Sequence, residues 1–181
     1  MKHFVLTSLG VLALATGAFA QAPSDIDKAL VAAPANLRAG ATVVKWKPDF
    51  TYDTLKQGTN RLVCFDKSGF PTQPAYMIEC TSIANLDRVA QNLKFETELD
   101  KTKRQAALDA AEANGTRVKP EYGSVWYHMA GPDAEHARPH MTIALPGATT
   151  QSTGIPDNNK AGGVWIMNAG TTTAHIMTPG E

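Results

Sequence analysis

Histidine and methionine are unevenly distributed along this chain, and both side chains bind transition metals. Of five histidines in 181 residues, the last four all lie beyond residue 127, at His128, His136, His140 and His175. Four methionines share that region, at positions 129, 141, 167 and 177. Imidazole nitrogen binds zinc and copper, and a thioether favours Cu(I). This part of the chain is therefore the first candidate for a metal site.

Three of these histidines fall in segments expected to be β-strands, where residues i and i+2 share a face. In segment 140–145 the apolar residues alternate on one face, so His140 is expected on the other. If the strands lie in one sheet with their faces aligned, His128, His140 and His175 converge on one side, with Met177 as the nearest soft ligand. This pattern predicts binding of Cu or Zn, or of another small ligand, on a C-terminal sheet.

An alternative interpretation remains open for the same residues. Each histidine could be a hydrogen-bonded group at a strand end, and each methionine could fill the core. No H-x-x-H, H-E-x-x-H or M-x-x-M spacing is present. A slip of one residue in strand register would also move a histidine to the opposite face. The predicted metal site thus depends on the register of the strands as well as on the types of residue.

A second polar cluster lies in segment 131–140. A carboxylate beside an imidazole can orient it as a general base, and Asp133 or Glu135 could do this for His136. The protein would then be a cofactor-free, hydrolase-like enzyme. The sequence has no G-x-S-x-G nucleophile motif, which argues against an enzyme. A structural or interaction module without a binding site is the third alternative.

The N-terminal residues 1–20 have the three parts of a secretory signal peptide: Lys2 near the start, the apolar run 4–15, and small residues up to Ala20. Cleavage there would leave residues 21–181 as a single globular domain. We expect this domain to be periplasmic or secreted and to contain no membrane span, since no later apolar run is long enough.

Cysteine content and charge further narrow the possible classes of protein. Cys64 and Cys80 are the only two cysteines, and in an oxidising compartment they are predicted to form a disulfide. The 17 basic and 17 acidic side chains balance, which argues against a nucleic-acid-binding protein. The physiological partner and the oligomeric state stay open.

The elements that must position these residues suggest an α+β fold, with an N-terminal hairpin and helices followed by a C-terminal antiparallel sheet. Helical patterns cover 24–33 and 82–114, and a charged stretch in the second is either a solvated helix face or a break between two helices. Strands are expected at 41–46, at 124–129, 140–145, 163–168 and 172–177, and in a hairpin over 52–65.

Two short stretches carry a resemblance. The first is Gly58-Thr59-Asn60 followed by Cys64, a G-T-N-x-x-x-C pattern, and the second spans Ala169 to Met177, an A-G-T-x-x-A-H-x-M pattern. Both are similar to motifs of an uncharacterised group of secreted bacterial proteins. The resemblance implies no reaction and no ligand, so it assigns no site residue.

Overall fold

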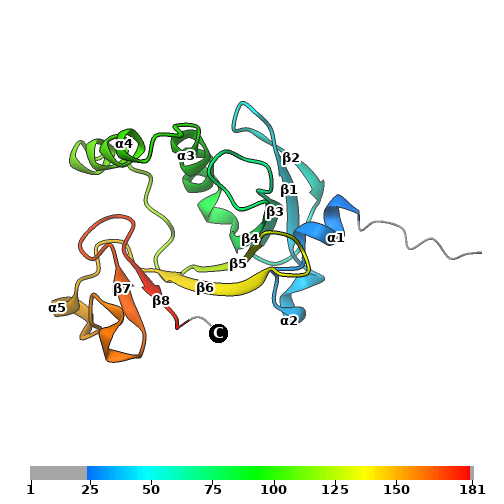
Figure 1. Cartoon of the computed structure of the whole chain (residues 1–181). Helices are drawn as coiled ribbons and strands as arrows, with labels where there is room; N and C mark the ends of the chain where they lie inside the picture. The colour runs from blue at the N-terminus through cyan, green and yellow to red at the C-terminus, as the bar shows by residue number, and fades with distance from the viewer. Residues whose placement is uncertain (1–23, 180–181) are drawn as a thin grey trace, which may run out of the picture.

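A computed structural model describes residues 24–179 as a mixed α+β fold built on one sheet (Figure 1). The helices are α1 (Asp25–Ala29), α2 (Ala35–Arg38), η1 (Ile83–Asn85), α3 (Leu86–Glu96), α4 (Lys101–Ala113), α5 (Thr150–Thr153) and η2 (Asn159–Ala161). The strands are β1 (Thr42–Trp46), β2 (Tyr52–Lys56), β3 (Leu62–Asp66), β4 (Tyr76–Ser82), β5 (Val125–Gly131), β6 (Arg138–Ala144), β7 (Trp165–Met167) and β8 (His175–Met177). Their order is β2-β1-β3-β4-β5-β6-β8-β7. All neighbours are antiparallel except β1 and β3.

The predicted hairpin over 52–65 is wrong, although both of its strands exist. β2 pairs with β1, with Trp46 opposite Tyr52, and β3 pairs in parallel with the other edge of β1. β1 therefore lies between the two strands that we expected to be partners. The short 58–60 turn leads the chain past β1 instead of folding β3 back on β2. The C-terminal strands likewise continue the same sheet and do not form a separate one.

The two faces of the sheet are covered by different helices. On one face α1 and α2 pack over Val43, Cys64 and Cys80. On the other, α3 packs over Val63, Phe65 and their neighbours, and Figure 1 shows α1 and α3 on opposite sides of the strands. Cys64 lies opposite Cys80 in register and forms the predicted disulfide with it.

α3 is amphipathic, and its apolar stripe holds it on the sheet. Leu86, Val89 and Leu93 recur at helical spacing and are buried against β1 and β3. The charged middle of segment 82–114 is a break between two helices, since residues 97–100 lie outside both. Asp100 starts α4 by accepting hydrogen bonds from the first backbone N–H groups of that helix.

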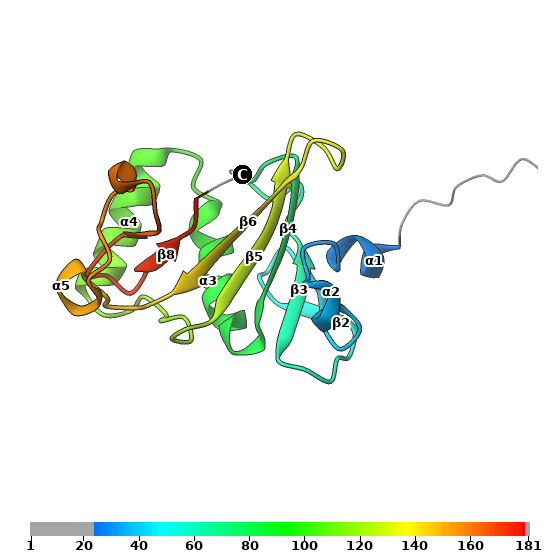
Figure 2. The ribbon, with the colours of Figure 1, turned by 90° about the horizontal axis from the view of Figure 1, so that it is seen from below.

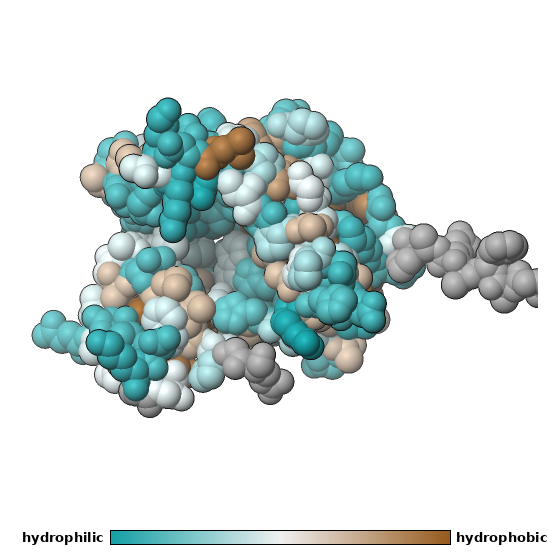
Figure 3. All heavy atoms as spheres, in the orientation of Figure 1, coloured by the Kyte–Doolittle hydropathy of each residue, from teal (hydrophilic) through white to brown (hydrophobic). Residues whose placement is uncertain are grey.

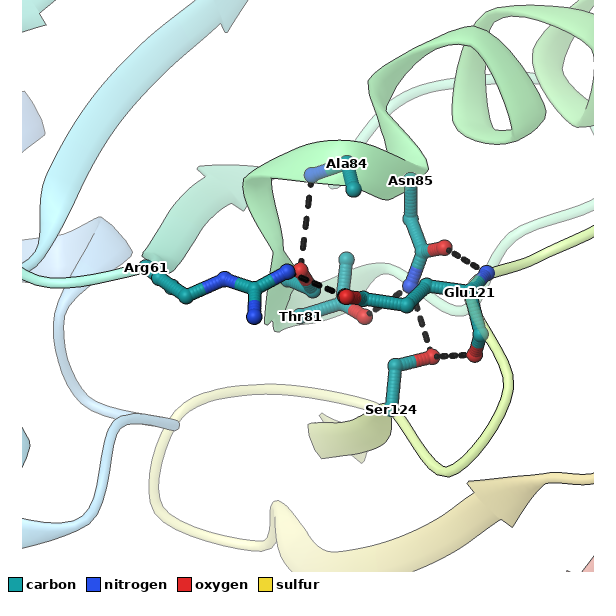
Figure 4. Close-up of polar contacts among 7 residues, drawn as sticks. Arg61, Thr81, Ala84, Asn85, Glu121 and Ser124 are labelled. Carbon is teal, nitrogen blue, oxygen red and sulfur yellow. Dashed lines mark hydrogen bonds and ion pairs between the residues drawn. The ribbon is translucent and has the colours of Figure 1, made fainter.

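Asn85 ties the start of α3 to the chain that leads into β5 (Figure 4). Its amide nitrogen donates to the hydroxyls of Thr81 at 2.8 Å and Ser124 at 2.9 Å, and its carbonyl accepts from the backbone N–H of Glu121 at 2.7 Å. The side chain is fully buried, so each of these bonds replaces a lost contact with water. Glu121 also forms an ion pair with Arg61. This cluster fixes the position of α3 above β4 and β5, which run side by side with β6 through the middle of the sheet (Figure 2).

The predicted signal peptide, residues 1–20, lies outside the described residues. Among residues 24–179, no helix has the length and apolar character needed to cross a bilayer.

Candidate functional site: a cleft lined by three histidines

A cleft of about 420 Å³ opens between α3, the middle of the sheet and the β7–β8 hairpin. Figure 3 shows the surface hollowed between the α3–α4 side and the β7–β8 side. The floor contributes Glu79, Trp126, His128, His140 and Thr142, α3 contributes Arg88, Asn92 and Glu96, and the hairpin contributes Met167, Thr173, His175 and Met177. All the histidines and the methionine predicted from alternation therefore line one cleft.

Three titratable residues stand in a row across the floor. Glu79 on β4 lies opposite His128 on β5, which lies opposite His140 on β6. The two imidazole rings are stacked, with centroids 6.0 Å apart and planes 27° apart. Nδ1 of His128 is 3.4 Å from Oε2 of Glu79, an ion-pair distance without hydrogen-bond geometry. Within residues 24–179, neither this Nδ1 nor Oε1 of Glu79 has a hydrogen-bond partner.

A buried lysine holds the carboxylate of this row ionised. Nζ of Lys67 lies 3.6 Å from Oε2 of Glu79 and 3.4 Å from Oε1 of Glu96. Burial would raise the pKa of Glu79, but the charges of Lys67 and His128 outweigh it and lower that pKa. Burial likewise disfavours the charged form of Lys67, and the two carboxylates reverse this and raise its pKa. Lys67 and Glu79 are therefore both charged at neutral pH.

His175 is positioned by contacts made to Thr172 and Thr173, just before it in the chain. Its Nδ1 lies 2.7 Å from the carbonyl oxygen of Thr173. Because a carbonyl only accepts, this Nδ1 carries the proton and the lone pair lies on Nε2. Arg88 of α3 donates to the hydroxyl of Thr173 at 2.7 Å, and Glu112 of α4 accepts from the backbone N–H of Thr172 at 3.1 Å. Both long helices thus hold the chain that presents His175.

Two of the cleft imidazoles are kept neutral. Burial lowers the pKa of His140, and the neighbouring His128 and His175 lower it further. Burial also lowers the pKa of His175, helped by His128 and Arg88 and opposed by the hydrogen bond to Thr173. A neutral imidazole has a free lone pair, which a metal ligand requires.

The histidines share a face and a cleft, but they do not stand around one point. His140 faces His128 directly, whereas His175 faces Ala144, four residues further along β6. That offset is about 13 Å along a strand. Among the described residues, no group of three or more His, Cys, Asp and Glu has the spacing to hold a metal ion. A single ion shared by all three imidazoles therefore stays a prediction, and strand register is the reason that it is not assembled here.

The methionines divide between the two faces of the sheet. Met77, Met167 and Met177 line the cleft. Met129 and Met141 lie next to His128 and His140 in the sequence, so strand alternation turns them to the opposite face. Of the two methionines near His175, Met167 was not among the predicted site residues. Met167 lies opposite His175 because of the register between β7 and β8, which cannot be predicted from the local sequence.

Lys67, Glu79 and Arg88 were also missed by sequence reasoning. A weak signal exists for Glu79, because it stands between the apolar residues Ile78 and Cys80 in a segment with strand character. A charged residue in such a setting is either at an exposed face or paired in the interior. For Lys67 and Arg88 the local sequence carries no comparable signal.

The alternative enzyme site forms an exposed dyad. Asp133 accepts from Nδ1 of His136 at 2.8 Å and from the backbone N–H of the same residue at 2.9 Å. Their side chains are 55% and 64% exposed in the β5–β6 loop. Glu135 makes no side-chain contact with His136 among the described interactions. The dyad is thus a turn at the surface, and nothing in its surroundings would exclude water or position a substrate.

Comparison of the chain with protein-family models, with curated proteins and with solved structures finds no match. The geometry of the cleft is therefore the feature that indicates a function.

Proposed function

We propose that this protein binds transition metal, copper or zinc, in the cleft lined by His128, His140 and His175, with His128 and His140 holding one ion. One observation carries the proposal: three of the four histidines within residues 24–179 line a single cleft, and burial keeps His140 and His175 neutral. Neutral imidazole is the commonest metal ligand of proteins. His136, the fourth, lies in an exposed loop.

The outer contacts of these imidazoles support the proposal. Metal-binding histidines usually direct one ring nitrogen at a carboxylate or a carbonyl, and this orients the other toward the metal. His175 has this arrangement with the carbonyl of Thr173. His128 directs Nδ1 at the ionised carboxylate of Glu79. In His175 this leaves Nε2 for a ligand.

His128 and His140 are the two imidazoles best placed to bind the same ion. Directly opposite residues of antiparallel strands have Cβ atoms about 4.5–5.5 Å apart, so rotation of the two side chains brings both Nε2 atoms within reach of one ion. Zinc–nitrogen bonds of about 2.0–2.1 Å require such an approach. His175 and Met177 line the same cleft from β8, the strand next to β6.

Metal titration of the purified protein tests the proposal. Binding of Zn(II) and Cu(II) is measured by calorimetry for the wild type and for the H128A/H140A variant, and we expect the variant to bind about 100-fold more weakly or not at all. H136A is the matched control, because it removes an imidazole outside the cleft. Thermal unfolding monitors the fold of each variant. Equal affinity of H128A/H140A and wild type would refute the proposal, as would a loss in H136A alone.

We also propose that residues 1–20 direct export and are removed, so that the domain acts in the periplasm or outside the cell. The Cys64–Cys80 disulfide supports this, since disulfides persist in oxidising compartments. Expression of the full chain in a bacterial host, followed by fractionation and mass spectrometry, should give a periplasmic product that begins at Gln21. An unprocessed cytoplasmic product would contradict the proposal.

A further inference from the structure

We infer that the β7–β8 hairpin carries a soft copper(I) subsite made of Met167, His175 and Met177, separate from the pair formed by His128 and His140. The inference deepens the proposed function: it rests on metal binding in the same cleft and specifies a second position, an ion and an oxidation state.

The three residues occupy one face of the hairpin. Met167 on β7 lies directly opposite His175 on β8, and Met177 follows His175 by two residues, so it points to the same side. All three line the cleft. Opposite Cβ atoms on paired strands lie about 4.5–5.5 Å apart, and alternate residues of one strand lie about 7 Å apart. The flexible thioether chains can span these separations to meet the imidazole.

The donor set suits a soft, singly charged ion. Two thioethers and one imidazole are all uncharged, and thioether sulfur selects Cu(I) over harder divalent ions. Nε2 of His175 is the available ring nitrogen, because Nδ1 donates to the carbonyl of Thr173 at 2.7 Å. The two acidic residues that line the cleft, Glu79 and Glu96, both contact Lys67. They are thus engaged away from the hairpin.

Core packing does not explain why these methionines are there. The small apolar cluster at this end of the sheet consists of Ala148, Ile166 and Ala174, and each of these is nearly or completely buried. Ile166 alternates with Met167 along β7, so it faces away from the cleft. Met167 and Met177 are only half-buried and lie on the cleft side.

The register separates this subsite from the imidazole pair. His175 faces Ala144, whereas His128 faces His140 further along β6. Along β6, the position opposite His175 is four residues from His140, and the position opposite Met177, Thr142, is two residues from it, so the two sets of donors are placed at different points of one cleft. A wild-type protein is expected to bind one Cu(I) at the hairpin in addition to an ion at the imidazole pair.

The experiment compares Cu(I) and Zn(II) in matched variants. Cu(I) affinity is measured anaerobically by competition with bicinchoninate, with ascorbate as reductant so that the disulfide is retained, and Zn(II) affinity is measured by calorimetry. In M167L/M177L we expect Cu(I) to bind about tenfold more weakly or worse, with Zn(II) affinity unchanged. M129L/M141L is the control, because its two methionines lie on the other face and its Cu(I) affinity should match wild type. Copper X-ray absorption should detect sulfur ligands in wild type and lose them in M167L/M177L.

The outcomes separate this inference from the proposed function. Equal Cu(I) affinity in M167L/M177L and wild type, or an equal loss in M129L/M141L, would overturn the copper(I) subsite. Zn(II) binding that depends on His128 and His140 would survive either result. Conversely, loss of Cu(I) in M167L/M177L without any Zn(II) binding would support the subsite and remove the imidazole pair. Leucine matches methionine in volume and keeps the fold intact, which thermal unfolding verifies.

Discussion

Lys67→Met should be among the most destabilising substitutions at the cleft. The side chains of Lys67 and Glu79 are 5% and 4% exposed, and Nζ lies 3.6 Å from Oε2. At an effective dielectric constant of about 20, opposite charges at this distance attract by about 4–5 kcal/mol. The substitution leaves the carboxylate of Glu79 buried without that countercharge. We therefore expect the free energy of unfolding to fall by about 3–5 kcal/mol.

The pH dependence of this loss has a definite sign. In wild type the pKa of Glu79 is lowered by Lys67 and His128, so its stabilising contribution is present above the unfolded pKa and is lost as the pH falls through the folded pKa. Without Lys67, burial dominates and raises the pKa of Glu79. The variant should then gain stability as the pH is lowered from about 8 to about 5, because protonation removes the buried charge. Wild type should not show this gain.

Urea unfolding followed by circular dichroism at several pH values measures both effects. The matched control is Lys45→Met, because the Lys45–Asp25 ion pair is shorter, at 2.8 Å, but its side chains are 63% and 66% exposed. Such exposed pairs contribute about 0–1 kcal/mol. K67M/E79Q should recover part of the stability lost in K67M, since the amide buries no charge. A loss in K67M no larger than in K45M, or a K67M stability that falls at lower pH, would refute the reasoning.

Three further predictions concern the fold. Replacing Cys64 and Cys80 with alanine should lower the free energy of unfolding by about 3 kcal/mol, because the two residues are 16 apart in the sequence and closing a loop of about 15 residues contributes that much. Urea unfolding measures the change, and an unchanged midpoint would contradict the chain-entropy account. Asn85→Ala should lower the free energy of unfolding by about 2–4 kcal/mol in the same assay, since it leaves buried hydrogen-bonding groups of three neighbours without a partner. A decrease below about 1 kcal/mol would mean that water replaces the amide. Leu93 is fully buried, so Leu93→Ala should lower the free energy of unfolding by about 2–5 kcal/mol. Leu99 is 72% exposed, so Leu99→Ala should change that free energy little. Equal effects would mean that α3 is not held by its apolar stripe.

Local periodicity predicted which face each site residue occupies. A strand turns alternate side chains to opposite faces whatever its partners are, so each segment showed which residues share a face with its own histidine. The common side of His128, His140 and His175 also required the register between the strands. The helical spacing of Leu86, Val89 and Leu93 predicted α3 in the same way. The disulfide followed from cysteine count and compartment. The alternation and the helical spacing are properties of short stretches of chain.

Local patterns of this kind could not predict how the strands pair. β1 inserts between β2 and β3, which overturned the hairpin expected at 52–65. The register of β8 on β6 placed His175 opposite Ala144 and away from His140. Pairing of this kind depends on contacts between residues far apart in the chain, so no short segment encodes it.

The charged lining of the cleft depended on tertiary structure for the same reason. Lys67 and Glu79 stabilise each other's charged forms only because β3 and β4 bring them together in a buried place. Met167 joins His175 only through the pairing of β7 with β8. Residue types and pleat parity therefore determined which side chains could meet, and the register of distant strands decided which of them do.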